Sequence, residues 1–273
     1  MNLGEFQATA ALRWGRSVWG SEFEPQNPDA YFSRLAEAGY SFVEVACPDS
    51  PSQAACWKAA AERVGLGIVA QIHSTGNTPE EHVESLRKQL RHSVGMAPEL
   101  VNAHSGRDHF TSIENIGILR HTLDFARTLG LEIVHETHRS RATFSAPSTA
   151  RLVTEIPDLR LCADFSHWCC VHESFLDDQA PAVTAALDRA DYLHLRVGHT
   201  QSPQVPDPGA PEWQNAVNRH MAWWRAKIKS MNKGESIRVA PEFGPFPYGQ
   251  FSDSSEDLWL LNESMRRLFL LLL

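Results

Sequence analysis

Short apolar runs, separated by polar segments of helix length, recur along the whole chain. Eight of these runs are nearly continuous in their apolar character, as expected for parallel strands covered on both faces. They span residues 9–15, 42–46, 68–73, 100–104, 132–137, 159–164, 192–197 and 237–243. Eight strands that alternate with helices, without a linker or low-complexity break, predict a single (β/α)₈ TIM barrel domain over residues 1–273.

The segments between the apolar runs carry helix start and stop signals. Thr78 and Pro79 precede Glu80 and Glu81, which combines an N-cap, a proline at the first helical position and a capping-box glutamate. Further starts are predicted at Asn27-Pro28 and at Thr111 with Glu114, and stops at Gly39, Gly65, Gly95, Gly130 and Gly234. A doubly wound open sheet is the alternative fold, but no GxGxxG follows the first strand.

Four of the predicted strands carry, at or near their carboxyl end, a residue that can bind a metal. These residues are Glu136, Asp164, His194 and Glu242. Carboxylates and imidazoles at buried strand ends are costly unless they are paired or bound to a metal. In a barrel the carboxyl ends of all strands meet at the catalytic face. One histidine and three carboxylates from four strands therefore predict a site for a divalent cation.

Other polar residues at the strand ends are expected to line a pocket around this site. Side chains alternate along a strand, so His138 shares a face with Glu136, and Arg196 shares one with His194. The predicted substrate-binding residues are Glu44, His73, His104, His138, His167, Arg196, His199 and Trp14. Mutual hydrogen bonding in the barrel mouth is the alternative for Glu44, His73 and His104. An inward-pointing Arg196 could bind a carboxylate or phosphate.

Several short motifs, in this order, resemble those of the xylose-isomerase-like TIM barrels. They are GYSFVEV after the first helix, a Glu ending strand five, D-x-x-H at 164–167, a His on strand seven and PEF on strand eight. This group includes sugar isomerases, ketose 3-epimerases and inosose dehydratases. In the ketose epimerase branch, Glu, Asp, His and Glu of strands five to eight hold the metal. The resemblance places these ligands at Glu136, Asp164, His194 and Glu242. By the same resemblance, His167 of D-x-x-H corresponds to a residue that contacts a substrate hydroxyl.

The chain departs from the epimerase branch on strand seven. That branch carries a second histidine two positions along this strand, where this chain has Arg196. His199 is the next histidine, so the ligand from strand seven is His194 or His199, and we favour His194.

A mostly hard set of ligands suits one Mn²⁺ or Mg²⁺ ion, and Zn²⁺ or Co²⁺ would also fit. Four protein ligands leave positions for two adjacent substrate oxygens. We expect strands five and eight to face each other, so that Glu136 and Glu242 flank a substrate carbon as catalytic acid and base. The predicted function is a metal-dependent isomerase or epimerase of a small sugar or polyhydroxy carbonyl compound, acting through a metal-bound enediolate.

Three other functions remain open. A metal-dependent dehydratase would use the same proton abstraction, and a non-catalytic barrel would only bind a ligand. A phosphodiesterase similar to endonuclease IV would use a multinuclear, histidine-rich cluster. Seven of the thirteen histidines lie at or just past predicted strand ends, at 73, 104, 135, 138, 167, 194 and 199. The net charge of −8 argues against nucleic acid as a partner.

The remaining features concern the cellular context. Five cysteines without a CxxC spacing favour a reducing compartment, and the first residues lack a secretory signal, so we expect a cytoplasmic protein. The C-terminal LFLLLL run is too short to span a membrane. It favours helix packing or a homodimer contact.

The Pro-rich segment 197–212 is the longest predicted loop and should lie on the catalytic face.

Overall fold

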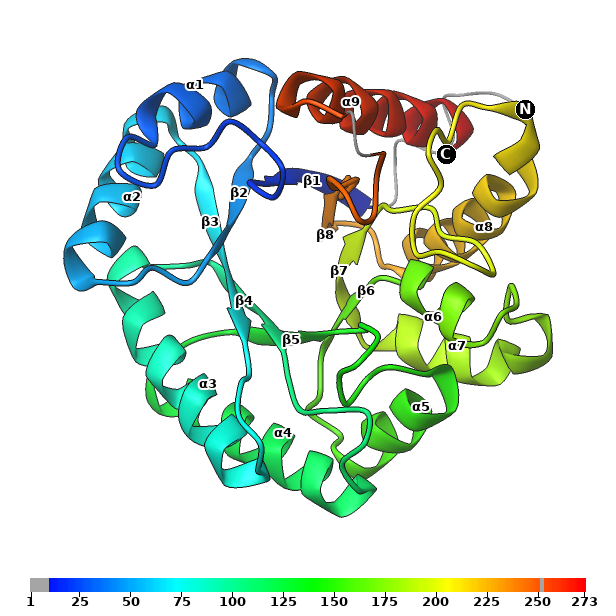
Figure 1. Ribbon diagram of the computed structural model, residues 1–273, viewed down its shortest axis with the longest axis horizontal. Coiled ribbons are helices and arrows are strands. Elements are labelled where there is room, and N and C mark those ends of the chain that lie inside the picture. The colour runs from blue at the N-terminus through cyan, green and yellow to red at the C-terminus, as the bar shows by residue number, and fades with distance from the viewer. Residues whose placement is uncertain (1–9, 251–252) are drawn as a thin grey trace.

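Eight parallel strands pair in chain order, and the last closes onto the first (Figure 1). The structure is a computed structural model that describes residues 10–250 and 253–273. The strands are β1 (Ala10–Ser17), β2 (Phe42–Ala46), β3 (Gly67–His73), β4 (Leu100–His104), β5 (Ile133–Glu136), β6 (Leu161–Ala163), β7 (Ala190–His194) and β8 (Glu235–Ala240). The predicted (β/α)₈ barrel is confirmed, although Thr9 of the first predicted strand lies outside the described residues.

Helices form a ring around the strands, as Figure 1 shows in the view down the barrel. They are α1 (Asp29–Glu37), α2 (Pro51–Val64), α3 (Pro79–Ser93), α4 (Ser112–Thr128), α5 (Ala146–Glu155), α6 (Ser166–Val171), α7 (Ala180–Asp188), α8 (Gln214–Ser230) and α9 (Ser255–Leu272). Short 3₁₀ helices lie at η2 (Val94–Met96), η3 (Asp177–Gln179) and η4 (Pro211–Trp213). No helix in the described part of the chain is long and apolar enough to cross a membrane.

Most of the predicted helix ends are confirmed. Thr78 and Thr111 both form capping boxes, and Gly65 ends α2 in the left-handed conformation with φ of 72°. The cap predicted at Asn27 is wrong, because α1 begins after Pro28 and has no side-chain cap. The stop predicted at Gly95 is also wrong: α3 continues into η2, and Ala97 makes the left-handed turn.

Two apolar layers make up the core. The inner layer fills the barrel and consists of Phe42, Val69, Leu100, Val134, Cys162, Tyr192 and Ala240. Gly15 is required in this layer, because a Cβ atom there would lie 1.9 Å from the ring of Phe42. The outer layer, which is larger, packs the strands against the helices. Together they form the floor beneath the polar strand ends.

Trp14 belongs to the outer layer and not to the pocket. Its ring packs edge-on against Phe269 of α9, with 5.7 Å between ring centroids, and the guanidinium of Arg266 lies over it. The expected substrate role of Trp14 is therefore wrong. The alternation of side chains along β1 places this residue on the outer face of the barrel.

The loop after β7 is anchored at several points. Val205 N donates to Val197 O (2.8 Å), and Gln204 exchanges two hydrogen bonds with the backbone of Gly244. His220 of α8 is completely buried beneath this loop; its Nδ1 donates to Ala216 O and its Nε2 accepts from Gly198 N. The bond that Nε2 accepts requires a neutral imidazole, because both ring nitrogens are donors in the charged form. At the end of α9, Leu270 and Leu271 are exposed. The homodimer contact expected of this segment stays a prediction.

Burial lowers the pKa of His220 to about 4. The unfolded chain binds a proton near pH 6.5, so this group's stabilising contribution is complete above pH 6.5 and is lost as the pH falls toward 4. We expect the free energy of unfolding to fall by about 3 kcal/mol more over this interval in the wild type than in His220→Gln. Urea unfolding at a series of pH values measures both slopes. Parallel slopes for the two proteins would contradict this account.

Candidate metal and substrate site

Four potential metal ligands converge at the carboxyl ends of the last four strands. Glu136 ends β5, Asp164 directly follows β6, His194 ends β7 and Glu242 lies two residues past β8. One ligand atom from each lies within 4.8 Å of the others, and all four side chains are buried. The convergence expected from the sequence is therefore present in the structure.

Glu44 of β2 fixes the orientation of the His194 ring. Its Oε2 accepts hydrogen bonds from His194 Nε2 (3.1 Å) and from the hydroxyl of Tyr192 (2.8 Å). With Nε2 held by Glu44, the other ring nitrogen, Nδ1, faces the cluster. This nitrogen lies 2.9 Å from Glu242 Oε2 and 3.6 Å from Glu136 Oε2. A carboxylate behind a histidine is a common device for orienting a metal ligand.

Asn102 of β4 connects Glu44 to Glu136. Its Nδ2 donates to Glu44 Oε1 (2.9 Å) and to Glu136 Oε2 (2.8 Å). One amide thus holds two buried carboxylates in place. These hydrogen bonds leave Glu136 Oε1 without a partner among the described residues.

Arg196 reaches into the cluster from the loop after β7. Its Nη2 donates to Asp164 Oδ2 and lies 3.4 Å from Glu242 Oε2. The other oxygen of Asp164 accepts from the amide and hydroxyl of Ser166. Arg196 Nη2 also lies 2.7 Å from Nε2 of His167, which accepts the bond. The guanidinium of Arg196 is therefore occupied by the cluster and is not presented to a substrate acid.

Burial and nearby charges act in opposite directions on the pKa values of the cluster. Burial raises the pKa of Glu136, and it raises the pKa of Asp164 to about 6 despite the opposing charge of Arg196. For Glu242, His194 and Arg196 outweigh burial and lower the pKa to about 2. Burial opposes the charging of His194, but the surrounding anionic groups move its pKa well above the ordinary value.

The donor set fits a divalent cation. Four buried carboxylates, at Glu44, Glu136, Asp164 and Glu242, face one buried guanidinium and the His194 ring, so potential negative charge exceeds positive charge. Glu136 Oε1, Glu242 Oε2 and His194 Nδ1 are buried atoms without a hydrogen-bond partner in the described chain. A buried excess charge with unpartnered donors is stabilised by a bound cation. Asp164 retains lone pairs for such an ion beside its hydrogen bonds.

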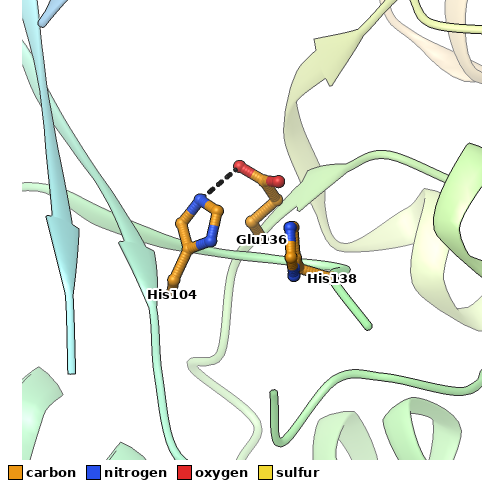
Figure 2. Close-up of side chains that lie close together, drawn as sticks. All are labelled: His104, Glu136 and His138. Atoms are coloured by element: carbon orange, nitrogen blue, oxygen red, sulfur yellow. Dashed lines mark ion pairs between the residues drawn. The ribbon is translucent and has the colours of Figure 1, made fainter. Parts of the chain in front are cut away.

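A second group of ligand atoms shares Glu136. Figure 2 shows His104 of β4 and Glu136 turned toward each other, with His138 beside them; Nε2 of His104 lies 2.9 Å from Glu136 Oε2. Nδ1 of His138 donates to the carbonyl of Arg139, which leaves Nε2 free to accept or ligate. The ligand atoms of these three residues also lie within 4.8 Å of one another.

Four histidine rings form a row along one side of the site. Ring centroids lie 4.3 Å apart for His73 and His104, 4.7 Å for His104 and His138, and 3.8 Å for His138 and His167. Burial lowers the pKa of His73 and of His104 to about 3, and moves that of the other two well below the ordinary value. The row therefore presents neutral imidazoles.

A pocket of about 400 Å³ opens above the cluster. Its lining consists of Ser17, Val18, Trp19, Ala46, Gln71, His73, His104, Glu136, His138, Arg141, Arg196, Glu242 and Tyr248. The expected residues Glu44, His167, Asp164 and His194 are buried behind this lining. His199 does not line it, since its ring lies 4.6 Å from Trp213 in the loop after β7. The substrate role expected of His199, and its alternative role as a ligand, are therefore wrong.

The sequence did not point to the aromatic wall of the pocket. Trp19 and Tyr248 meet edge to face, 4.9 Å apart between ring centroids, and the guanidinium of Arg196 lies against both rings. Trp19 needs Gly244 opposite it, because a Cβ there would lie 2.1 Å from the indole. Both aromatic residues lie in loops, where strand periodicity carries no information.

The arrangement of strands corrects one further expectation. In the closed order, β5 and β8 are separated by β6 and β7, so they do not face each other directly. Glu136 and Glu242 nevertheless approach the same space, because each side chain lies close to Nδ1 of His194. Their separation is set by the cluster and not by the full width of the barrel.

The fold and the site together define the class of protein: a (β/α)₈ barrel with a buried cluster of potential metal ligands at the carboxyl ends of its strands. The sequence matches the family model of the xylose isomerase-like TIM barrel over residues 32–224, so the chain belongs to this family. No curated protein matches the chain.

Solved structures with this fold include proteins of different activities. An IOLI protein with a bound zinc atom superposes with a TM-score of 0.68 at 11% identity, over 94% of this chain and 98% of that one. D-psicose 3-epimerase, solved with D-fructose, gives 0.62 at 15%, over 93% and 96%. Endonuclease IV from Thermus thermophilus gives 0.61 at 17%, over 94% and 98%. At these identities the likeness shows the fold alone.

We expect the Arg196–Asp164 pair to be essential for stability when no metal is bound. Replacing Arg196 by Met leaves buried carboxylates unpaired, so the free energy of unfolding of chelator-treated protein should fall by roughly 3–5 kcal/mol. Arg160→Met is the matched control, because the Arg160–Asp191 pair is partly exposed and should cost less than about 1 kcal/mol. Urea unfolding measures both, and equal losses would contradict the assigned role of Arg196.

Proposed function

We propose that the protein is a divalent-metal-dependent isomerase or epimerase of a small sugar or polyhydroxy carbonyl compound. One observation carries this proposal: four potential ligands lie within 4.8 Å of one another, and Glu136 and Glu242 among them also line the pocket. The pocket has room for a small polyhydroxy molecule against the wall of Trp19 and Tyr248. The epimerase among the similar structures is consistent with this choice.

The residues that would hold the ion are Glu136, Asp164, His194 and Glu242. Oxygen donors predominate, which favours Mn²⁺ or Mg²⁺, while one imidazole also suits Zn²⁺ or Co²⁺. When bound, such an ion polarises a carbonyl and orients the neighbouring hydroxyl. Glu44 has the separate task of holding the His194 ring with Nδ1 toward the ion.

Glu136 and Glu242 are the proposed acid and base. Both reach the pocket, so one carboxylate can remove a proton next to the carbonyl and the other can return one. Their opposite pKa shifts suit this division, because burial raises the pKa of Glu136, whereas His194 and Arg196 lower that of Glu242. At neutral pH, Glu242 is thus the ionised member of the pair, and Glu136 is the member with the higher proton affinity.

Two further activities fit parts of the site. A dehydratase would begin with the same proton abstraction and then eliminate water. A phosphodiesterase of the endonuclease IV kind is favoured by the second group of ligand atoms at His104, Glu136 and His138. The net charge of −8 argues against a nucleic-acid substrate.

Exchange of substrate hydrogen with solvent deuterium tests the proposed chemistry directly. Metal-loaded protein should introduce deuterium next to the carbonyl of at least one member of a panel of ketoses and inososes. Glu136→Gln and Glu242→Gln should each lower the rate at least about 100-fold, which is typical for a lost acid or base. Glu132→Gln, exposed just before β5, is the control. Full exchange in either site variant would remove that residue from the acid–base pair.

Metal analysis separates the competing sites. After treatment with a chelator and dialysis against Mn²⁺ or Zn²⁺, we expect one ion per chain by mass spectrometry. Asp164→Ala should lower occupancy, while Asp158→Ala on the surface should not. Two or three tightly bound ions per chain would favour the phosphodiesterase alternative. Unchanged occupancy in Asp164→Ala would mean that the ion lies elsewhere.

A further inference from the structure

The pocket lining contains groups of opposite charge. Glu136 and Glu242 contribute carboxylates from the ends of β5 and β8. Arg141, from the loop that joins β5 to α5, contributes a guanidinium that is bonded to Ser74, the residue directly after β3. Arg196 is the second arginine in the lining, but it is already paired with Asp164.

Arg141 is a guanidinium that no carboxylate neutralises. Its Nη1 donates to the carbonyl of Ser74 (2.9 Å), and no described acidic residue forms an ion pair with it. The side chain is half-buried, and its remaining N–H groups are not enclosed by protein. The neighbouring ring of His73 lines the same pocket and makes no hydrogen bond to another described residue. Both can donate to an anionic group.

The backbone holds Arg141 in a fixed position. Ala142 N donates to Ser105 O (2.9 Å), and the hydroxyl of Thr143 donates to the carbonyl of Glu136. Ser140 adopts the left-handed conformation with φ of 64°, which costs a non-glycine residue about 1 kcal/mol. A strained, well-bonded turn that presents one unpaired guanidinium to a pocket is typical of a preorganised binding group.

We propose that Arg141 selects substrates bearing an anionic oxygen group, a carboxylate or a phosphate, at the end of the molecule away from the metal ligands. This inference rests on the proposed function for the location of the reacting end. At the metal ligands, a bound ion would take the carbonyl and hydroxyl oxygens of the reacting end, which leaves the acidic group for another part of the pocket. At Arg141 the same group meets a planar fork of donors suited to carboxylate and phosphate oxygens.

Binding of three ligands with the same six-carbon chain tests this selection. Sorbitol is neutral, gluconate carries a carboxylate, and sorbitol 6-phosphate carries a phosphate. Calorimetry with Mn²⁺-loaded wild type should show at least one acidic ligand binding about 10-fold or more tightly than sorbitol. Arg141→Met should weaken acidic binding roughly 10- to 100-fold and leave sorbitol unchanged. Whether Arg141→Met weakens the binding of gluconate or of sorbitol 6-phosphate shows whether Arg141 selects a carboxylate or a phosphate.

Two further variants separate selection from a structural role. Arg141→Lys keeps the charge and should retain part of the acidic preference. Arg139→Met removes a nearby guanidinium that stacks on Tyr248 and does not line the pocket, so it should change neither affinity. Lack of acidic preference in the wild type, or equal weakening of sorbitol and the acidic ligands in Arg141→Met, overturns the inference. Acidic preference without any deuterium exchange would support it and count against the proposed reaction.

Discussion

The excess of buried negative charge at the carboxyl end of the barrel is the constraint on which the site depends. Four carboxylates share one guanidinium and the His194 ring, and three donor atoms of the cluster have no hydrogen-bond partner in the described chain. Isolated buried carboxylates would be unstable. The surrounding framework of Asn102, Tyr192 and Ser166 exists to hold them, and it leaves a space whose chemistry suits a cation.

The buried polar cluster lies between the apolar interior of the barrel and the aromatic residues of the loops. Below it, the apolar plug of Phe42 and Tyr192 fills the barrel, and the Tyr192 hydroxyl supplies the first hydrogen bond of the polar network. Above it, Trp19 and Tyr248 from the loops flank Arg196. The site thus combines a rigid floor, a low-dielectric middle and a lining that substrate can reach. This arrangement strengthens every electrostatic interaction made within it.

Arg196 gives the site its particular character. Its guanidinium pairs with Asp164 and supports His167. A permanent charge so close to the ligands competes with a cation for Asp164, and it also prevents Arg196 from recognising a substrate acid. The proposed anion-binding residue is therefore Arg141, which lines the pocket and forms no ion pair with a described acidic residue.

The barrel and its four convergent residues could be predicted from the amino-acid sequence. Continuous apolar runs give the number of strands, and the polar residues at their carboxyl ends, together with the family resemblance, allowed Glu136, Asp164, His194 and Glu242 to be named in advance. The rest of the site depends on tertiary contacts. Trp19, Arg141 and Tyr248 lie in loops without periodicity. Trp14 was misjudged because alternation along β1 does not show which face points inward, whereas its packing against Phe269 of α9 does. Strand pattern is a local property of the chain, whereas loop contacts depend on residues far apart in sequence.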